Sequence, residues 1–167
     1  AYNPLLNGYA ANDCAATELN GNTRDGAISF TGVRTATIQG QVHDEKCYYA
    51  MGGISGHAGL FSNATEVAKL AAVMRTGGYG ENRYFSRNVM DAFTAPMKED
   101  AANLGLGWWR EGDNQRCWYF GTQAPSNTIG QQGWTGTLTM IDPVENLVVV
   151  YLTNKINSPV TDKAANP

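Results

Sequence analysis

A glycine-rich stretch that runs directly into a helical pattern is the most constraining feature of this sequence. Glycines occupy positions 52, 53, 56 and 59, and His57, one of two histidines in the chain, lies among them. Glycine admits backbone conformations that are closed to other residues and lets other groups approach closely. These residues therefore predict a tight, irregular loop of the kind that forms a buried wall or the margin of a binding site.

A helix over about residues 64–76 should follow this loop. Asn63 suits the N-cap, and Glu66 could complete a capping box by accepting from the backbone N–H of the cap residue. An apolar stripe at helical spacing follows, made by Val67, Leu70, Ala71 and Met74, and Gly77 is a suitable C-terminal residue. A second helix is expected from Ser86 to about Thr94, before Pro96.

The last third of the chain favours strands. Segments 104–109, 117–120 and 133–141 carry strand-like residues, and the apolar run 147–153 predicts a strand that is buried on both faces. Helices followed by strands indicate an α+β fold. We divide the chain into a loop-rich and helical segment, 1–100, and an antiparallel sheet segment, 101–167.

Composition excludes several classes of partner. The 167 residues carry a net charge of −3 and contain no basic run, which argues against nucleic acid and anionic membrane surfaces. No stretch approaches the roughly 20 apolar residues that span a bilayer. Three widely spaced cysteines (Cys14, Cys47, Cys117) form no cluster with histidine, so no metal site is expected. They are free thiols, or two of them form a disulfide whose pairing the sequence does not assign. No phosphate-cradling loop is present, and we expect no cofactor.

Nucleophile motifs are missing from the sequence. Gly53-Ile54-Ser55-Gly56-His57 is similar to a nucleophile elbow, but His57 replaces the second glycine and no histidine follows it. No serine has a lysine three positions later. We therefore expect no catalytic nucleophile in this chain. His43 stands beside two carboxylates, which would favour its cationic form if they were close in space; the alternative is an ordinary polar loop.

Several motifs together resemble one family. They are V-H-D-E at 42–45, G-G-I-S-G-H-A-G-L-F-S at 52–62, I-G-Q-Q-G-W-T-G-T at 129–137, D-P at 142–143 and L-T-N-K at 152–155. Their order and spacing resemble the signature of serine β-lactamase-related penicillin-binding proteins and esterases. The resemblance covers about residues 40–76 and 129–155. It implies a partial β-lactamase/transpeptidase-like fold, in which a sheet-containing domain and a mainly helical domain enclose the active site.

The same resemblance implies that this is the C-terminal part of a longer protein. In the family, the Ser-x-x-Lys nucleophile and base and the Tyr-x-Asn motif precede the glycine-rich segment, and neither is present here. We therefore expect this chain alone to be inactive and to need the missing N-terminal portion as its partner. The other implied partner is a peptidoglycan peptide or a β-lactam. The implied location is the bacterial cell envelope, periplasmic or membrane-associated.

The third family motif, Lys/His-Thr/Ser-Gly, maps onto Gln131, Gln132 and Gly133, which we predict to bind substrate. A neutral amide replaces the usual charged residue, so recognition of a carboxylate should be weaker, because charge-assisted hydrogen bonds are the stronger ones. The alternative is that Gln131 and Gln132 are polar residues at the start of a strand and have no role in binding. Gly56, His57 and Gly59 are assigned by the same resemblance to a structural loop, with His57 satisfying buried backbone groups rather than touching substrate.

The expected activity is that of a D-alanyl-D-alanine carboxypeptidase working through an acyl-enzyme. A non-catalytic cell-wall or protein-binding module on the same scaffold is the alternative favoured by the neutral third motif. An esterase of the same family is a further alternative.

Overall fold

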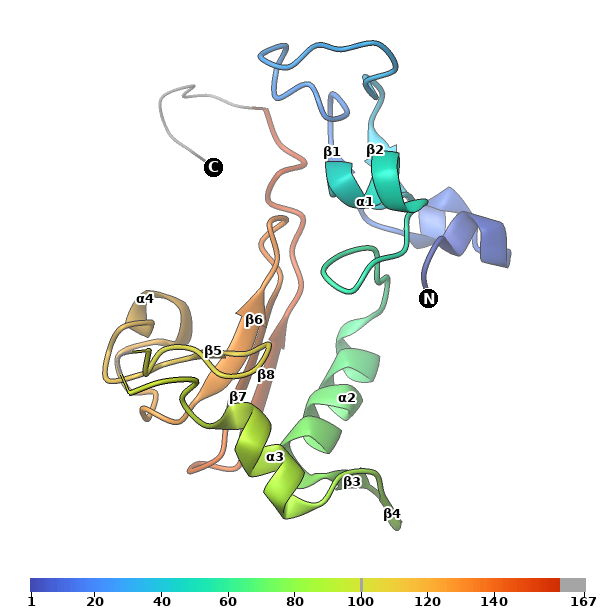
Figure 1. The fold of residues 1–167 in the computed structure, drawn as a ribbon. Coiled ribbons are helices and arrows are strands. Elements are labelled where there is room, and N and C mark those ends of the chain that lie inside the picture. The colour runs from blue at the N-terminus through green and yellow to red at the C-terminus, as the bar shows by residue number, and fades with distance from the viewer. Residues whose placement is uncertain (100, 160–167) are drawn as a thin grey trace. The chain divides into compact units, whose positions relative to one another are not determined.

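The computed structural model describes residues 1–99 and 101–159 and confirms an α+β fold (Figure 1). Two short 3-10 helices, Pro4–Asn7 and Ala11–Asp13, open the chain. The elements that follow are β1 (Ala16–Glu18), β2 (Ile38–Gln39), α1 (Glu45–Met51), α2 (Ala64–Thr76), β3 (Gly78–Tyr79), β4 (Asn82–Arg83), α3 (Arg87–Thr94), β5 (Trp109–Arg110), α4 (Cys117–Phe120), β6 (Ile129–Gln132), β7 (Leu138–Asp142) and β8 (Leu147–Tyr151).

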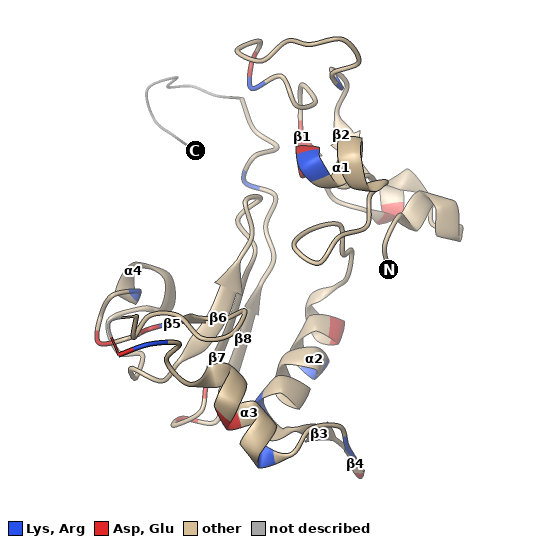
Figure 2. Cartoon of the chain, in the orientation of Figure 1, with Lys and Arg blue, Asp and Glu red and all other residues tan. Residues whose placement is uncertain are grey.

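The chain divides into two compact units. The first contains residues 1–62, 134–136 and the described residues from 153 onward; the second contains residues 63–133 and 137–152. Acidic and basic residues are distributed over the elements of both units (Figure 2). Each unit is described by itself below.

The first unit is built around a small antiparallel pair, β1 and β2, and helix α1. Asp44 caps α1, because its carboxylate accepts from the backbone N–H of Cys47 at 2.7 Å. The sequence did not predict α1, since its short stretch of mixed polar and aromatic residues carries little apolar periodicity. Cys47 is fully buried beneath the glycine-rich loop, and its thiol donates to the carbonyl of Ala58 at 3.5 Å.

The second unit contains a four-stranded antiparallel sheet in the order β5-β6-β7-β8. Its core is formed by Ile129 and Ile141 of the sheet with Ala71 of α2, joined by the partly buried Met74, Trp108 and Val148. Ile129, Ile141 and Val148 are register partners, so they project from one face of the sheet. Helix α2 therefore covers that face with Ala71 and Met74 of its predicted apolar stripe, whereas Leu70 of the stripe is 54% exposed.

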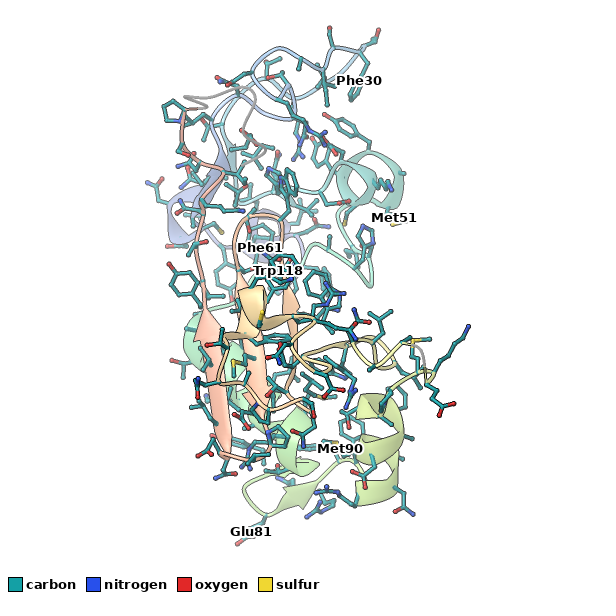
Figure 3. The ribbon with its side chains drawn as sticks, turned by 90° about the vertical axis from the view of Figure 1, so that its left-hand side faces the viewer. Phe30, Met51, Phe61, Glu81, Met90 and Trp118 are labelled. Carbon is teal, nitrogen blue, oxygen red and sulfur yellow. The ribbon has the colours of Figure 1, made fainter. Side chains whose placement is uncertain are left out.

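Both predicted helices are confirmed. The Asn63 side chain accepts from the backbone N–H of Glu66 at 3.0 Å, and Gly77 ends α2 in the left-handed conformation at φ 82°. The side chain of Glu66 does not complete the predicted capping box and instead pairs with Lys69 at 2.7 Å. Ser86 caps α3, whose buried residue is Met90 (Figure 3).

Two of the predicted strands differ from the structure. Residues 117–120 form the helix α4, not a strand, and Phe120 is its buried residue while Trp118 remains largely exposed (Figure 3). Four consecutive large residues show no alternation, so they do not distinguish a strand from a helical turn, and Gly121 ends the turn. Within 104–109, regular pairing is limited to an isolated bridge between Leu104 and Trp109 and to the start of β5.

The bounds and the burial of the last strands also differ from the prediction. Residues 133–137 form the connection between β6 and β7, so the predicted strand over 133–141 begins only at Leu138, as β7. The prediction that 147–153 is buried on both faces is wrong, because β8 ends at Tyr151, and Leu147 and Tyr151 are 45% and 61% exposed. β8 is the last strand of the described sheet, and α2 covers only the face that carries Val148.

One buried acid makes the stability of the second unit depend on pH. Glu111, directly after β5, is 1% exposed, and neither carboxylate oxygen has a hydrogen-bond partner of normal geometry among the described residues. Burial raises the pKa of its carboxyl above the ordinary value, and the nearby backbone N–H of Asn114 offsets this only in part. The ionised form is therefore disfavoured in the folded protein.

Glu111→Gln should stabilise the protein at neutral pH. Because the folded pKa is raised, the contribution of this carboxyl to stability is complete below its unfolded pKa of 4.5 and is lost as the pH rises through the folded pKa. We expect the free energy of unfolding of the variant to exceed that of the unmodified chain by roughly 1 kcal/mol at pH 7. This difference should vanish near pH 4. Urea unfolding at both pH values measures this. The exposed Glu145→Gln is the control, and an equal gain in the control would contradict the explanation.

Candidate functional site

Strand β6 positions the three residues predicted to bind substrate. Gln131 and Gln132 are its last two residues, and Gly133 begins the connection to β7. Gln131 is exposed, and its side-chain amide donates to the carbonyl of Gly107 at 3.0 Å. That bond occupies one of its amide hydrogens and leaves its carbonyl oxygen as an acceptor. Gln132 is half-buried.

The backbone of Gln132 faces an unpaired part of the sheet edge. Antiparallel residues direct their backbone groups alternately to the two neighbouring strands. The N–H of Gly133 donates to Thr137 at 2.8 Å, on the β7 side, so the N–H and C=O of Gln132 point the other way. On that side β5 reaches only the pair of Trp109 with Gly130. No described strand therefore pairs with Gln132 there.

The connection after β6 explains the glycine at position 133. A Cβ atom there would lie 2.3 Å from the Thr137 hydroxyl oxygen, so a side chain at position 133 would force that hydroxyl to move. Its N–H is used within that turn. Gln132, and not Gly133, therefore presents its backbone donor and acceptor groups at the open edge. An extended peptide can add to such an edge through main-chain hydrogen bonds.

The neighbouring cation of β5 does not supply the charge that Gln131 lacks. The Arg110 guanidinium is buried and donates to the carbonyl oxygens of Thr94, at 2.8 Å, and Ala102. Burial lowers its pKa from the ordinary value, and the charge of Asp113 opposes this. Arg110 therefore links the end of α3 and the segment before β5 through hydrogen bonds to their carbonyl groups.

The glycine-rich loop of the first unit holds a chain of three polar side chains. The hydroxyl oxygen of Ser55 lies 3.0 Å from His57 Nδ1, and His57 Nε2 lies 3.2 Å from a carboxylate oxygen of Asp44. The His57 side chain is about half exposed, and it contacts side chains rather than the buried backbone groups that we expected. Sequence reasoning missed Asp44 as its partner, because 13 positions separate the two residues.

Gly56 and Gly59 of the loop differ in whether the structure leaves room for a side chain. Gly59 has φ 101°, and a Cβ atom there would lie 2.5 Å from the carbonyl oxygen of Gly53. Gly56 has open space where a Cβ atom would lie. Of these two glycines, Gly59 is therefore the one that close packing requires. The second histidine, His43, pairs with Glu18 at 3.2 Å rather than with the carboxylates beside it in the sequence, and both side chains are mostly buried.

The described residues contain no group of three or more His, Cys, Asp or Glu side chains that could hold a metal ion. Cys14, Cys47 and Cys117 are free thiols, which decides between the alternatives left open by the sequence. Among the residues that the structure describes, no helix has the length and apolar character needed to cross a membrane.

Comparisons with known proteins agree on the family. A model of the Beta-lactamase family matches residues 7–167. A protein of Escherichia coli (strain K12) named "Putative D-alanyl-D-alanine carboxypeptidase" is 52% identical over 99% of this chain and 38% of its own length. A protein of Bacillus subtilis (strain 168) named "N-acetylmuramyl-L-alanine amidase" is 50% identical over the same shares. A Salmonella typhi protein with the carboxypeptidase name is 49% identical.

The chain thus spans about 38% of the length of these relatives. No solved structure matches it. The family match covers nearly every residue, including the β6 edge and the glycine-rich loop. This chain belongs to the beta-lactamase family, whose members include serine hydrolases.

Proposed function

We propose that this chain is the C-terminal part of a penicillin-binding D-alanyl-D-alanine carboxypeptidase that acts on peptidoglycan peptides through an acyl-enzyme. The observation that carries the proposal is that no described strand pairs with the outward-facing backbone of Gln132 at the β6 edge, at the position of the third family motif. The carboxypeptidase name of relatives at 49–53% identity supports it. Under this proposal the protein works in the bacterial cell envelope, periplasmic or membrane-associated.

The edge would hold the substrate peptide as an added strand. The N–H and C=O of Gln132 would pair with the peptide backbone, and the Gln131 amide would contact the peptide's polar end. With a neutral amide at this position, the energy of binding a terminal carboxylate would be lower than with lysine or histidine. Backbone pairing would therefore carry a large share of the affinity.

The reacting serine and its lysine would come from polypeptide outside this chain. Segments 1–100 and 101–167 would then be two parts of one larger catalytic domain. The serine would attack the peptide or β-lactam carbonyl, form a covalent acyl-enzyme and release it to water.

Fluorescent penicillin tests the proposal. We expect a covalent adduct on the longer protein, mapped by peptide mass spectrometry to a Ser-x-x-Lys serine, and no such adduct on the 167-residue chain. Gln132→Pro removes the N–H that faces the open edge and should lower acylation of the longer protein about 100-fold, since substrate positioning contributes that much. Gln123→Pro, in an exposed loop, is the control. Penicillin bound to the 167-residue chain at any serine would contradict the proposal.

A non-catalytic binding module is the second candidate, and the neutral Gln131 is the observation that favours it. Hydrolysis of a D-Ala-D-Ala peptide by the longer protein would eliminate this candidate. An esterase would instead hydrolyse a short acyl ester much faster than the peptide, so the two substrates should be compared at equal protein concentration.

A further inference from the structure

The glycine-rich loop contains an arrangement that the family resemblance does not account for. Ser55, His57 and Asp44 form a continuous hydrogen-bonded chain within the first unit, with separations of 3.0 and 3.2 Å. A nucleophile within hydrogen-bond reach of a base, which a third group orients, is the structural signature of an activated hydroxyl. Such a constellation is recognised by geometry and by the role of each group rather than by order in the sequence.

The carboxylate determines which nitrogen of a neutral imidazole carries the hydrogen. Burial raises the pKa of the Asp44 carboxyl, but hydrogen bonds from the Cys47 N–H and from His57, with the charge of Lys46, outweigh it, so the net pKa is below the ordinary value. An ionised Asp44 only accepts hydrogen bonds, so His57 Nε2 carries the hydrogen that points to it. In the neutral ring, Nδ1 is then an acceptor for the Ser55 hydroxyl.

The loop also accommodates the state that follows proton transfer. When Nδ1 takes a proton, it can donate to the Ser55 oxygen, and Asp44 continues to accept from Nε2 of the imidazolium. The carbonyl of Ala58, 3.2 Å from the Ser55 oxygen, is a second acceptor for a hydroxyl hydrogen, and the Ala58 N–H donates to the same oxygen at 3.2 Å. Both protonation states of the ring therefore keep their hydrogen bonds, which is what a general base requires.

Two further features suit an acyl transfer. The backbone N–H groups of Gly56 and His57 have no hydrogen-bond partner among the described residues, and both residues are exposed. Such donors next to a nucleophile can stabilise a developing oxyanion. A Cβ atom built at Gly56 meets nothing within 4 Å, so a reactant has room to approach there.

We propose that Ser55 is a base-activated hydroxyl that is acylated by small apolar esters, with His57 as the general base and Asp44 as the positioning residue. The Ser55 oxygen bonds to the ester carbonyl carbon while its proton moves to His57 Nδ1. The leaving alcohol takes that proton as its bond to the acyl group breaks. Water then attacks the acyl-serine by the same route, which releases the carboxylic acid and restores Ser55.

The surroundings of the loop indicate the class of ester. Residues 52–62 contain no Lys, Arg, Asp or Glu, and Ile54 and Leu60 are 55% and 56% exposed. An uncharged acyl group therefore suits the side chains of this segment. The proposal does not rest on the carboxypeptidase function, for which we propose a different serine, outside this chain.

The test uses the 167-residue chain with a fluorescent fluorophosphonate and with p-nitrophenyl butyrate. We expect a single phosphonyl adduct, mapped by peptide mass spectrometry to Ser55, and a slow release of p-nitrophenol. His57→Gln should slow both reactions about 100-fold, the usual contribution of a general base. Asp44→Asn keeps a good N-cap for α1 and should also slow them.

Ser62→Ala is the matched control, because Ser62 is an exposed serine of the same loop, and this variant should react like the unmodified chain. Melting curves of all variants show whether each remains folded. No adduct, an adduct at another residue, or an unchanged rate in a folded His57→Gln variant would overturn the proposal. Penicillin labelling of the longer protein is a separate readout, so either proposal can fail without the other.

Discussion

Gly130→Ala should lower the free energy of unfolding by about 3 kcal/mol or more, since overpacking a tightly packed site costs this much when neighbours cannot move. Gly130 lies in the middle of β6, between Trp109 of β5 and Met140 of β7. A Cβ atom there would lie 2.2 Å from the carbonyl oxygen of Thr139 and 2.6 Å from a ring carbon of Phe120. The carbonyl belongs to a paired strand, so it cannot retreat without breaking the ladder.

Urea unfolding of the variant beside Gly56→Ala measures this effect. Both glycines lack a positive φ, so neither substitution is strained by backbone conformation, but Gly56 has open space around its Cβ position. We expect the Gly56 variant to stay within about 0.5 kcal/mol of the unmodified chain. Equal stability of the two variants would show that β7 and Phe120 can move aside.

Arg34→Lys should cost about 3 kcal/mol, although the charge is kept, because lysine cannot reproduce the fixed fork of donors. Arg34 donates twice to the side-chain oxygen of Asn22, at 2.9 and 2.6 Å, and to the carbonyls of Val42 and His43, at 2.9 and 3.1 Å. Its guanidinium carbon lies 3.6 Å from the ring centroid of Tyr48. Asn22 is buried, so a lost partner leaves an unsatisfied amide.

The control is Arg24→Lys. Arg24 pairs with Glu45 at 3.3 Å on the exposed surface of the same unit, where an ion pair contributes about 0–1 kcal/mol. Thermal and urea unfolding should therefore place the Arg24 variant close to the unmodified chain and the Arg34 variant well below it. If the Arg34 variant were as stable as the Arg24 variant, the charge alone, and not the geometry of the fork, would hold the 22–43 segment.

Local signals explain what could be predicted from the sequence. Asn63, Ser86 and Gly77 act within one turn of their own helices, so cap chemistry and an apolar stripe were sufficient to place α2 and α3. The apolar run at 147–151 likewise identified β8. Gln131 and Gln132 were singled out by their motif and lie on β6 as a strand-borne motif should.

Contacts between distant segments explain what was missed. The aromatic run 117–120 fits either a strand or a helical turn. In the structure it is helical, and Phe120 packs beside Gly130 of β6, which is a contact between distant segments. The exposure of Leu147 and Tyr151 depends on which face α2 covers, which no local pattern contains.

The sequence by itself determined the caps of α2 and α3, the α+β class and the family, because each depends on residues that are neighbours or on motifs of fixed spacing. The tertiary structure alone decided that β5 stops short of Gln132 and that Asp44 meets His57 across α1 and the loop. The physical reason is that an open backbone edge and a hydrogen-bonded chain of side chains both depend on the path of the polypeptide between residues far apart in sequence.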